Sequence, residues 1–158
     1  MQVNIILNGT KVTAEAAPDT LLIDFVRAHG CYSVKRGCET SNCGLCTVFL
    51  DDVPVLSCSV LAARADGHRV TTLEGLQEEA AEFGAFIADQ GAEQCGFCNP
   101  GFIMNASPSS GKRNTPLRRR SRNISRATSA AAPATRASCG ASRIFSPGKK
   151  AKIRRVTE

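Results

Sequence analysis

The sequence predicts an α+β fold in which a small sheet crossed by one helix is followed by a helical segment. Three observations lead to this prediction. Short β-rich segments surround one amphipathic segment in residues 1–75, a longer amphipathic segment begins at residue 76, and the composition changes sharply after residue 105. We therefore expect three parts, which are residues 1–75, residues 76–105 and residues 106–158.

The chain opens on a predicted β-hairpin. Residues 3–7 and 11–14 have the β-rich character of strands, and they flank Asn8-Gly9. Asn-Gly is the strongest short hairpin signal, because both central residues of a type I′ turn need a positive φ angle.

A helix is predicted next. Residues 21–29 place apolar side chains at helical spacing and end at Gly30. Asp19 and Thr20 precede this segment, and either could cap its N-terminus.

A second hairpin and a last strand complete the first part. Residues 47–50 and 53–56 are β-rich segments that flank a turn at Asp51-Asp52, and residues 69–72 form a further short strand. Two strands, a helix, a hairpin and a final strand follow one another in the order of a small β-grasp sheet.

The second part is predicted to be helical. Residues 76–90 place apolar side chains on one stripe, and Asn99 and Pro100 suit the N-cap and first position of a further helix. The stripe consists of Leu76, Ala80, Phe83, Phe86 and Ile87.

Four cysteines carry the main functional signal. Cys38, Cys43 and Cys46 are followed by Cys58, which is the C-x4-C-x2-C…C ligand spacing of a plant-type [2Fe–2S] cluster. Glycines at 37 and 44 give the loop backbone freedom without a Cβ. A cluster of this kind transfers single electrons, so the sequence predicts a redox relay.

A second cysteine pair leaves alternatives open. Cys95 and Cys98 lie at the predicted start of the last helix, and they could remain without a metal. They could also combine with Cys43 and Cys46 in a four-thiolate zinc site. The x4 gap and the position of Cys58 after a hairpin favour iron–sulfur over zinc.

Charge and leader signals bear on location and partners. Residues 1–105 hold six Lys and Arg against thirteen Asp and Glu, whereas residues 106–158 hold fourteen against one. The first residues lack a basic region and no apolar run could span a bilayer, so we expect a cytoplasmic protein without membrane contact. The basic run lacks interleaved aromatic residues, which argues against specific nucleic-acid binding.

Longer motifs carry a family resemblance. They are residues 37–48, Leu56-Ser57-Cys58, and residues 94–104, which read Gln-Cys-Gly-Phe-Cys-Asn-Pro-Gly-Phe-Ile-Met. Over residues 1–105 the chain closely resembles the small iron–sulfur subunit of the molybdenum hydroxylases, the family of xanthine dehydrogenase, aldehyde oxidase and carbon monoxide dehydrogenase. The resemblance implies a β-grasp ferredoxin domain and a four-helix domain, each with one [2Fe–2S] cluster.

The resemblance also implies roles for residues and partners. The first four cysteines would bind one cluster, and Cys95 and Cys98 would bind the other together with a Cys-Arg-Cys near the C-terminus. Gln94 would lie beside the pterin. Electrons would pass from a large molybdopterin subunit through this chain to FAD on another subunit or to another acceptor. The alternative is a free-standing [2Fe–2S] carrier of the ferredoxin type.

The last third departs from the family pattern. No Cys-x-Cys follows residue 98, and Cys139 stands alone. The genetic code permits a nucleotide sequence for residues 127–140 that encodes the missing Cys-Arg-Cys when it is translated one base earlier. We therefore infer a frame error between about Met104 and Pro116. We expect the tail to be disordered because it has few large apolar residues. We also expect one complete cluster per chain and an incomplete helical domain that exposes the apolar side chains around Phe83, Phe86, Ile87, Phe102 and Ile103.

Overall fold

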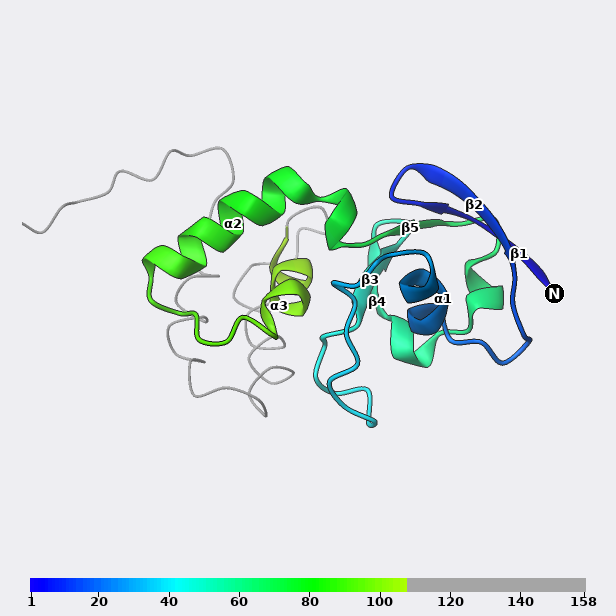
Figure 1. Cartoon of the computed structure of the whole chain (residues 1–158), viewed down its shortest axis with the longest axis horizontal. Helices are drawn as coiled ribbons and strands as arrows, with labels where there is room; N and C mark the ends of the chain where they lie inside the picture. Colours follow the sequence, from blue (N-terminus) through cyan, green and yellow to red (C-terminus); the bar gives the residue numbers. More distant parts are fainter. Residues whose placement is uncertain (108–158) are drawn as a thin grey trace, which may run out of the picture.

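The computed structural model describes residues 1–107 of the chain, in which five strands and one α-helix are followed by two further α-helices (Figure 1). The strands and α-helices are β1 Gln2–Leu7, β2 Thr10–Glu15, α1 Leu22–Ala28, β3 Thr47–Leu50, β4 Val53–Leu56, β5 Arg69–Thr71, α2 Gln77–Asp89 and α3 Asn99–Ala106. Short 3-10 helices occupy Ser57–Ser59, Ala62–Ala65 and Leu73–Gly75. The predicted strands and helices are all present, with ends that differ by one or two residues.

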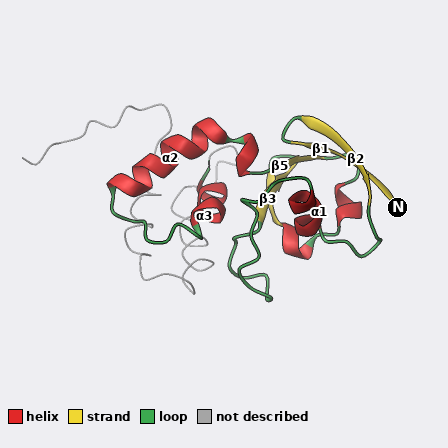
Figure 2. Ribbon diagram, in the orientation of Figure 1, coloured by secondary structure: helices red, strands yellow, loops and turns green. Residues whose placement is uncertain are grey.

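One mixed sheet organises the first part of the molecule. Its strand order is β2-β1-β5-β3-β4, in which β1 and β5 are parallel and the other neighbouring pairs are antiparallel. Helix α1 lies across this sheet, and α2 and α3 lie at the other end of the molecule (Figure 2). This is the predicted α+β arrangement, with a β-grasp sheet followed by helices.

The main core lies between α1 and the sheet. Apolar side chains alternate inward along β1, where the second, fourth and sixth residues are buried. Four of the seven residues of α1 are also buried, because the helix places its apolar stripe on the sheet. The core contains Val3, Ile5, Leu7, Leu22, Ile23, Phe25, Val26, Val48 and Val70.

Both hairpin turns use left-handed residues. Asn8 and Gly9 have φ angles of 50° and 85°, which confirms the predicted turn. Asp51 and Asp52 take φ angles of 48° and 66°, so the second hairpin uses the same kind of turn.

The start of α1 differs from the prediction. The residue before the helix is Leu21, and no side chain in the described part of the chain caps the helix, so neither Asp19 nor Thr20 acts as a cap. Instead Leu21 pairs with Leu61 in an isolated bridge, and the N–H of Leu22 donates to a neighbouring carbonyl oxygen at 2.7 Å. Backbone pairing with a distant segment therefore sets the start of this helix.

Helices α2 and α3 form a second core. The rings of Phe83 and Phe102 stack with centroids 5.9 Å apart, and Ile87 and Ile103 are buried beside them. The expectation that these apolar side chains are exposed is therefore wrong for all four, whereas Phe86 is partly exposed. The cap prediction for α3 is wrong by one residue, since Cys98 occupies the cap position.

Several sequence-based expectations fall on residues 108–158, outside the described residues. They are the expected disorder of the tail, the inferred frame error and the position of Cys139 outside any Cys-x-Cys. Within residues 1–107, no helix has the length and apolar character needed to cross a membrane.

Candidate metal centre

The first cysteine segment occupies the long loop between α1 and β3 (Figure 1). Cys58 lies in the 3-10 helix that follows β4. Cys43 and Cys46 are buried, whereas Cys38 and Cys58 are partly exposed. The register of β3 and β4 pairs Thr47 with Leu56, which brings the residues just outside the hairpin together.

Hydrogen bonds from Ser57 hold the segment that contains Cys58 against Cys46. Its N–H and its hydroxyl both donate to the carbonyl oxygen of Cys46, at 3.1 and 2.7 Å, and its side chain is fully buried. Because Cys58 is the next residue, its thiol lies beside that of Cys46, with the two Sγ atoms 3.2 Å apart.

The other two thiols form a second pair. The Cys38 Sγ accepts hydrogen bonds from the backbone N–H groups of Asn42 and Cys43, each at 3.4 Å, and it interacts with the Cys43 thiol. Among the described residues, no three His, Cys, Asp or Glu side chains converge on one point to hold a single metal ion. The four thiols are instead grouped two by two. Each iron of a [2Fe–2S] cluster takes two protein ligands, so this donor set fits a two-iron cluster.

Their surroundings shift the pKa values of Cys38, Cys43 and Cys46 in different directions. Backbone N–H groups of Cys43 and Asn42 stabilise the Cys38 thiolate and lower its pKa to about 6. Burial raises the pKa of Cys43, and it raises the pKa of Cys46 to about 11. Metal binding needs thiolates, so Cys38 is ready to bind at neutral pH, whereas Cys46 must release a proton.

The two predicted loop glycines serve different purposes. Gly44 has a φ angle of 72°, which agrees with the expected need for backbone freedom. Gly37 is needed for space, because a Cβ there would lie 2.7 Å from Leu45 Cδ2 and 3.3 Å from Cys43 Sγ.

Helix α3 presses directly on this loop. A Cβ at Gly101 would lie 2.6 Å from Leu45 Cα and 2.8 Å from Gly44 O. The side chain of Asn105 donates to Gly44 O at 3.2 Å and to Thr47 Oγ1 at 2.9 Å. Neither Gly101 nor Asn105 is predicted from the sequence to contact this loop. The sequence does hold a signal for Gly101, because a glycine inside a helix destabilises it by about 0.5–1 kcal/mol relative to alanine and therefore suggests a close contact.

The second cysteine pair is more open. Cys95 is exposed and Cys98 is partly exposed, in the segment between α2 and the start of α3, and Gln94 is also exposed. The Lys35 ammonium donates to the Phe97 carbonyl oxygen at 3.2 Å and lies 4.5 Å from the centre of its ring. This contact joins the two cysteine segments.

Comparison with known proteins agrees with this geometry. A sequence model described as a 2Fe-2S iron-sulfur cluster binding domain matches residues 5–73, and one described as a [2Fe-2S] binding domain matches residues 72–134. The chain is 38% identical over 107 residues to the small FeS subunit of nicotinate dehydrogenase from Eubacterium barkeri, a match that covers 66% of this chain and 68% of that protein. The chain belongs to the family of [2Fe–2S] iron–sulfur subunits.

Other members of the iron–sulfur subunit family extend the match. The iron-sulfur-binding subunit of xanthine dehydrogenase from Escherichia coli O157:H7 is 42% identical over 100 residues, which cover 62% of this chain. The match spans 63% of that relative, which is less than two thirds of its length. The structure superposes on aldehyde oxidoreductase from Desulfovibrio gigas with a TM-score of 0.71 and 30% identity, covering 90% of this chain and 17% of the other.

Proposed function

We propose that this chain is the electron-transfer subunit of a molybdenum hydroxylase of the xanthine dehydrogenase type. In this proposal Cys38, Cys43, Cys46 and Cys58 hold a [2Fe–2S] cluster, which supplies one-electron transfer when it is bound. A large molybdopterin subunit delivers electrons, and FAD on a further subunit or another acceptor receives them. The single observation that carries the proposal is the grouping of the four thiols in two pairs, with the Cys46 and Cys58 sulfurs 3.2 Å apart.

Residues around the thiols support the same role. The N–H groups of Asn42 and Cys43 point at the Cys38 sulfur, and the Ser41 hydroxyl lies 3.4 Å from the Cys58 sulfur. Hydrogen bonds to ligand sulfurs stabilise added negative charge, which raises the reduction potential of an iron–sulfur centre. The chain holds the centre and sets its potential, and substrate chemistry belongs to the large subunit.

The second cysteine pair gives an incomplete site in this proposal. Cys95 and Cys98 supply two thiols where a [2Fe–2S] cluster takes four. We therefore expect one complete cluster per chain. Gln94, exposed beside this pair, is the proposed neighbour of the pterin. The nucleotide sequence around codons 104–140 tests the proposed frame error directly.

Reconstitution tests the cluster. We expect the full chain, loaded with iron and sulfide, to be brown, to hold two irons and two sulfides, and to give a paramagnetic signal after reduction. Cys58→Ala should lose this signal. Cys31→Ala is the matched control, because Cys31 belongs to the first core, against which Cys58 packs, and lies outside the four.

The outcomes separate the alternatives. A colourless chain overturns the proposal, and four irons per chain overturn the single-cluster expectation. Copurification of a large molybdopterin subunit supports the hydroxylase assignment, whereas a loaded chain that purifies alone and reduces a soluble acceptor assigns it as a free-standing carrier.

A further inference from the structure

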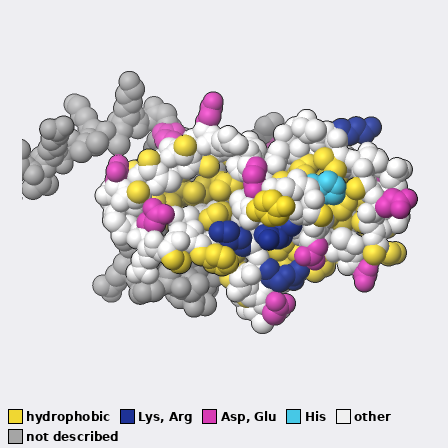
Figure 3. Space-filling view, in the orientation of Figure 1, with side chains coloured by type: hydrophobic (Ala, Val, Ile, Leu, Met, Phe, Trp, Pro, Cys, Tyr) yellow, Lys and Arg dark blue, Asp and Glu magenta, His cyan; other side chains and the backbone are white. Residues whose placement is uncertain are grey.

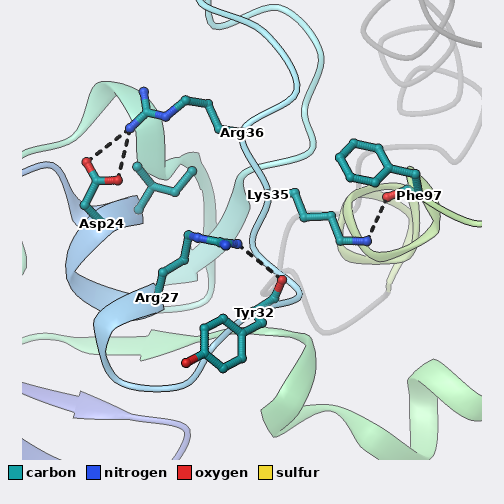
Figure 4. Close-up of a pocket in the computed structure, with 7 residues that line it drawn as sticks. Asp24, Arg27, Tyr32, Lys35, Arg36 and Phe97 are labelled. Atoms are coloured by element: carbon teal, nitrogen blue, oxygen red, sulfur yellow. Dashed lines mark hydrogen bonds and ion pairs between the residues drawn. The ribbon is translucent and has the colours of Figure 1, made fainter.

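A basic pocket lies beside both cysteine segments. Its volume is about 310 Å³, and it is bounded by α1, by the residues just before Cys38 and by Phe97 (Figure 4). Arg27, Lys35 and Arg36 line it. Residues 1–105 hold six Lys and Arg against thirteen acids, so half the cations of this acidic part of the chain gather in one place. Figure 3 shows Lys and Arg side chains together near the middle of one face, next to hydrophobic side chains.

Two of the three positive charges have no carboxylate partner among the lining residues. Arg36 pairs with Asp24 at 3.1 Å, and Asp24 is the one acid among the residues of the described part that line the pocket. Arg27 and Lys35 donate to backbone carbonyl oxygens, at 2.7 and 3.2 Å. A carbonyl oxygen carries no net charge, so the pocket is positive on an otherwise acidic body. Such a patch attracts anionic groups and orients them.

The cations are spread out and do not converge. In Figure 4 Arg36 points toward Asp24, Arg27 toward the backbone of Tyr32, and Lys35 toward Phe97. A small anion such as phosphate is bound by donors that meet at one point. Positive charges separated across an open pocket instead suit several carboxylates along one segment of a protein.

Aromatic side chains at the rim favour a protein partner. Tyr32 is 67% exposed and Phe97 is 51% exposed, and each lies beside a cation of the pocket. Aromatic residues and arginine are enriched at the centres of protein–protein interfaces. The chain's own residues 106–158 carry the wrong charge for this pocket, with fourteen Lys and Arg against one acid. The acidic body around it disfavours a nucleic acid.

We propose that this pocket docks an acidic segment of the protein that exchanges electrons with the Cys38–Cys58 site. Arg36 lies two residues before Cys38, and Phe97 lies between Cys95 and Cys98, so a segment bound here sits next to both cysteine segments. This inference rests on the proposed function, because it names the docking site of that function's electron-transfer partner.

A fluorescent reporter tests occupancy of the pocket. The chain contains no tryptophan, so Tyr32→Trp in the full, cluster-loaded chain places a unique fluorophore at the rim. The probe is a hexaglutamate peptide. We expect it to shift the reporter's emission, to bind about fivefold more weakly after Lys35→Met, and to bind as before after Lys35→Arg. Lys11→Met on β2 is the matched control and should leave binding unchanged.

Other results would overturn the proposal. Equal losses from Lys35→Met and Lys11→Met would mean a general charge effect. Tighter binding of pyrophosphate than of hexaglutamate would mean a small-anion site. Self-association that Lys35→Met abolishes would assign the pocket to a second copy. Should Lys35→Met fail to fold, Arg36→Met at an exposed position replaces it.

The same samples keep the two proposals apart. Absorbance and paramagnetic signals report the cluster independently of peptide binding. A chain with a cluster and no peptide binding sinks the docking proposal alone, whereas a chain that binds peptide and never forms a cluster sinks the proposed function.

Discussion

Gly101 of α3 lies against the backbone of Leu45 in the first cysteine loop, so closely that a Cβ at Gly101 would come within 2.6 Å of Leu45 Cα. The atoms on the other side are backbone, which cannot rotate away as a side chain can. The helix after the second cysteine pair therefore braces the loop that holds three of the first four cysteines.

Gly101→Ala should separate α3 from the loop. We expect a loss of about 1–3 kcal/mol in the free energy of unfolding, which is typical of overpacking, and slower reconstitution of the cluster. Gly84→Ala in α2 is the matched control, because a Cβ there meets no atom of residues 1–107 within 4 Å outside its own helix. It should be neutral or stabilise by up to about 1 kcal/mol. Urea unfolding measures the free energy of unfolding of both variants. Equal effects would contradict the conclusion that α3 supports the cysteine loop through Gly101.

Ser57→Ala should loosen the pairing of Cys46 with Cys58. The buried hydroxyl donates to Cys46 O at 2.7 Å, and losing such a bond costs about 0.5–1.5 kcal/mol. Ser59→Ala, in the same 3-10 helix, removes an exposed hydroxyl and is the control. We expect faster loss of iron to a chelator from the Ser57 variant alone. Identical release rates from the two variants would rule out this role.

Asn8 should stabilise the fold through both its backbone conformation and its side-chain hydrogen bonds. Its φ angle is 50°, its side-chain oxygen accepts from Thr72 N at 2.8 Å, and its amide donates to Thr72 Oγ1 at 3.0 Å. Asn8→Gly keeps the turn and loses the hydrogen bonds, which should lower the free energy of unfolding by about 1 kcal/mol. Asn8→Ala loses the hydrogen bonds and also disfavours the turn, which should lower it by about 2–3 kcal/mol. Thermal unfolding of the two variants measures the difference, which vanishes if the turn needs no positive φ.

Glu74 should make stability depend on pH. Burial alone would raise its pKa, but hydrogen bonds from Ser33 and Thr72 outweigh burial and hold the pKa below its ordinary 4.5. A lowered folded-state pKa stabilises the fold above the ordinary value, and this contribution disappears as the pH falls through the folded-state pKa.

The matching experiment compares wild type with Glu74→Gln in the same metal state. We expect the variant to be less stable at pH 7 and the gap to close at pH values below about 4.5. Glu78→Gln changes an exposed carboxylate of α2 and should show no such closing gap. A gap that stays constant with pH would show that the loss comes from packing.

The sequence by itself determined the strands, the first turn and the spacing of the cysteines. Those features are local: Asn8-Gly9 favours its own turn, and four thiols at this spacing suit a two-iron cluster before any fold is known. The roles of the six predicted cysteine ligands and of Gln94, and the boundaries of the three parts, stay predictions.

Only the tertiary structure decided how distant segments meet. The start of α1 depends on pairing of Leu21 with Leu61, the space at Gly37 depends on Leu45, and the brace on that loop depends on Gly101. The basic pocket likewise joins residues 23–36 with Phe97. Each is a contact between residues far apart in the chain or across a folded loop, and local propensity carries no information about which surfaces the fold brings together.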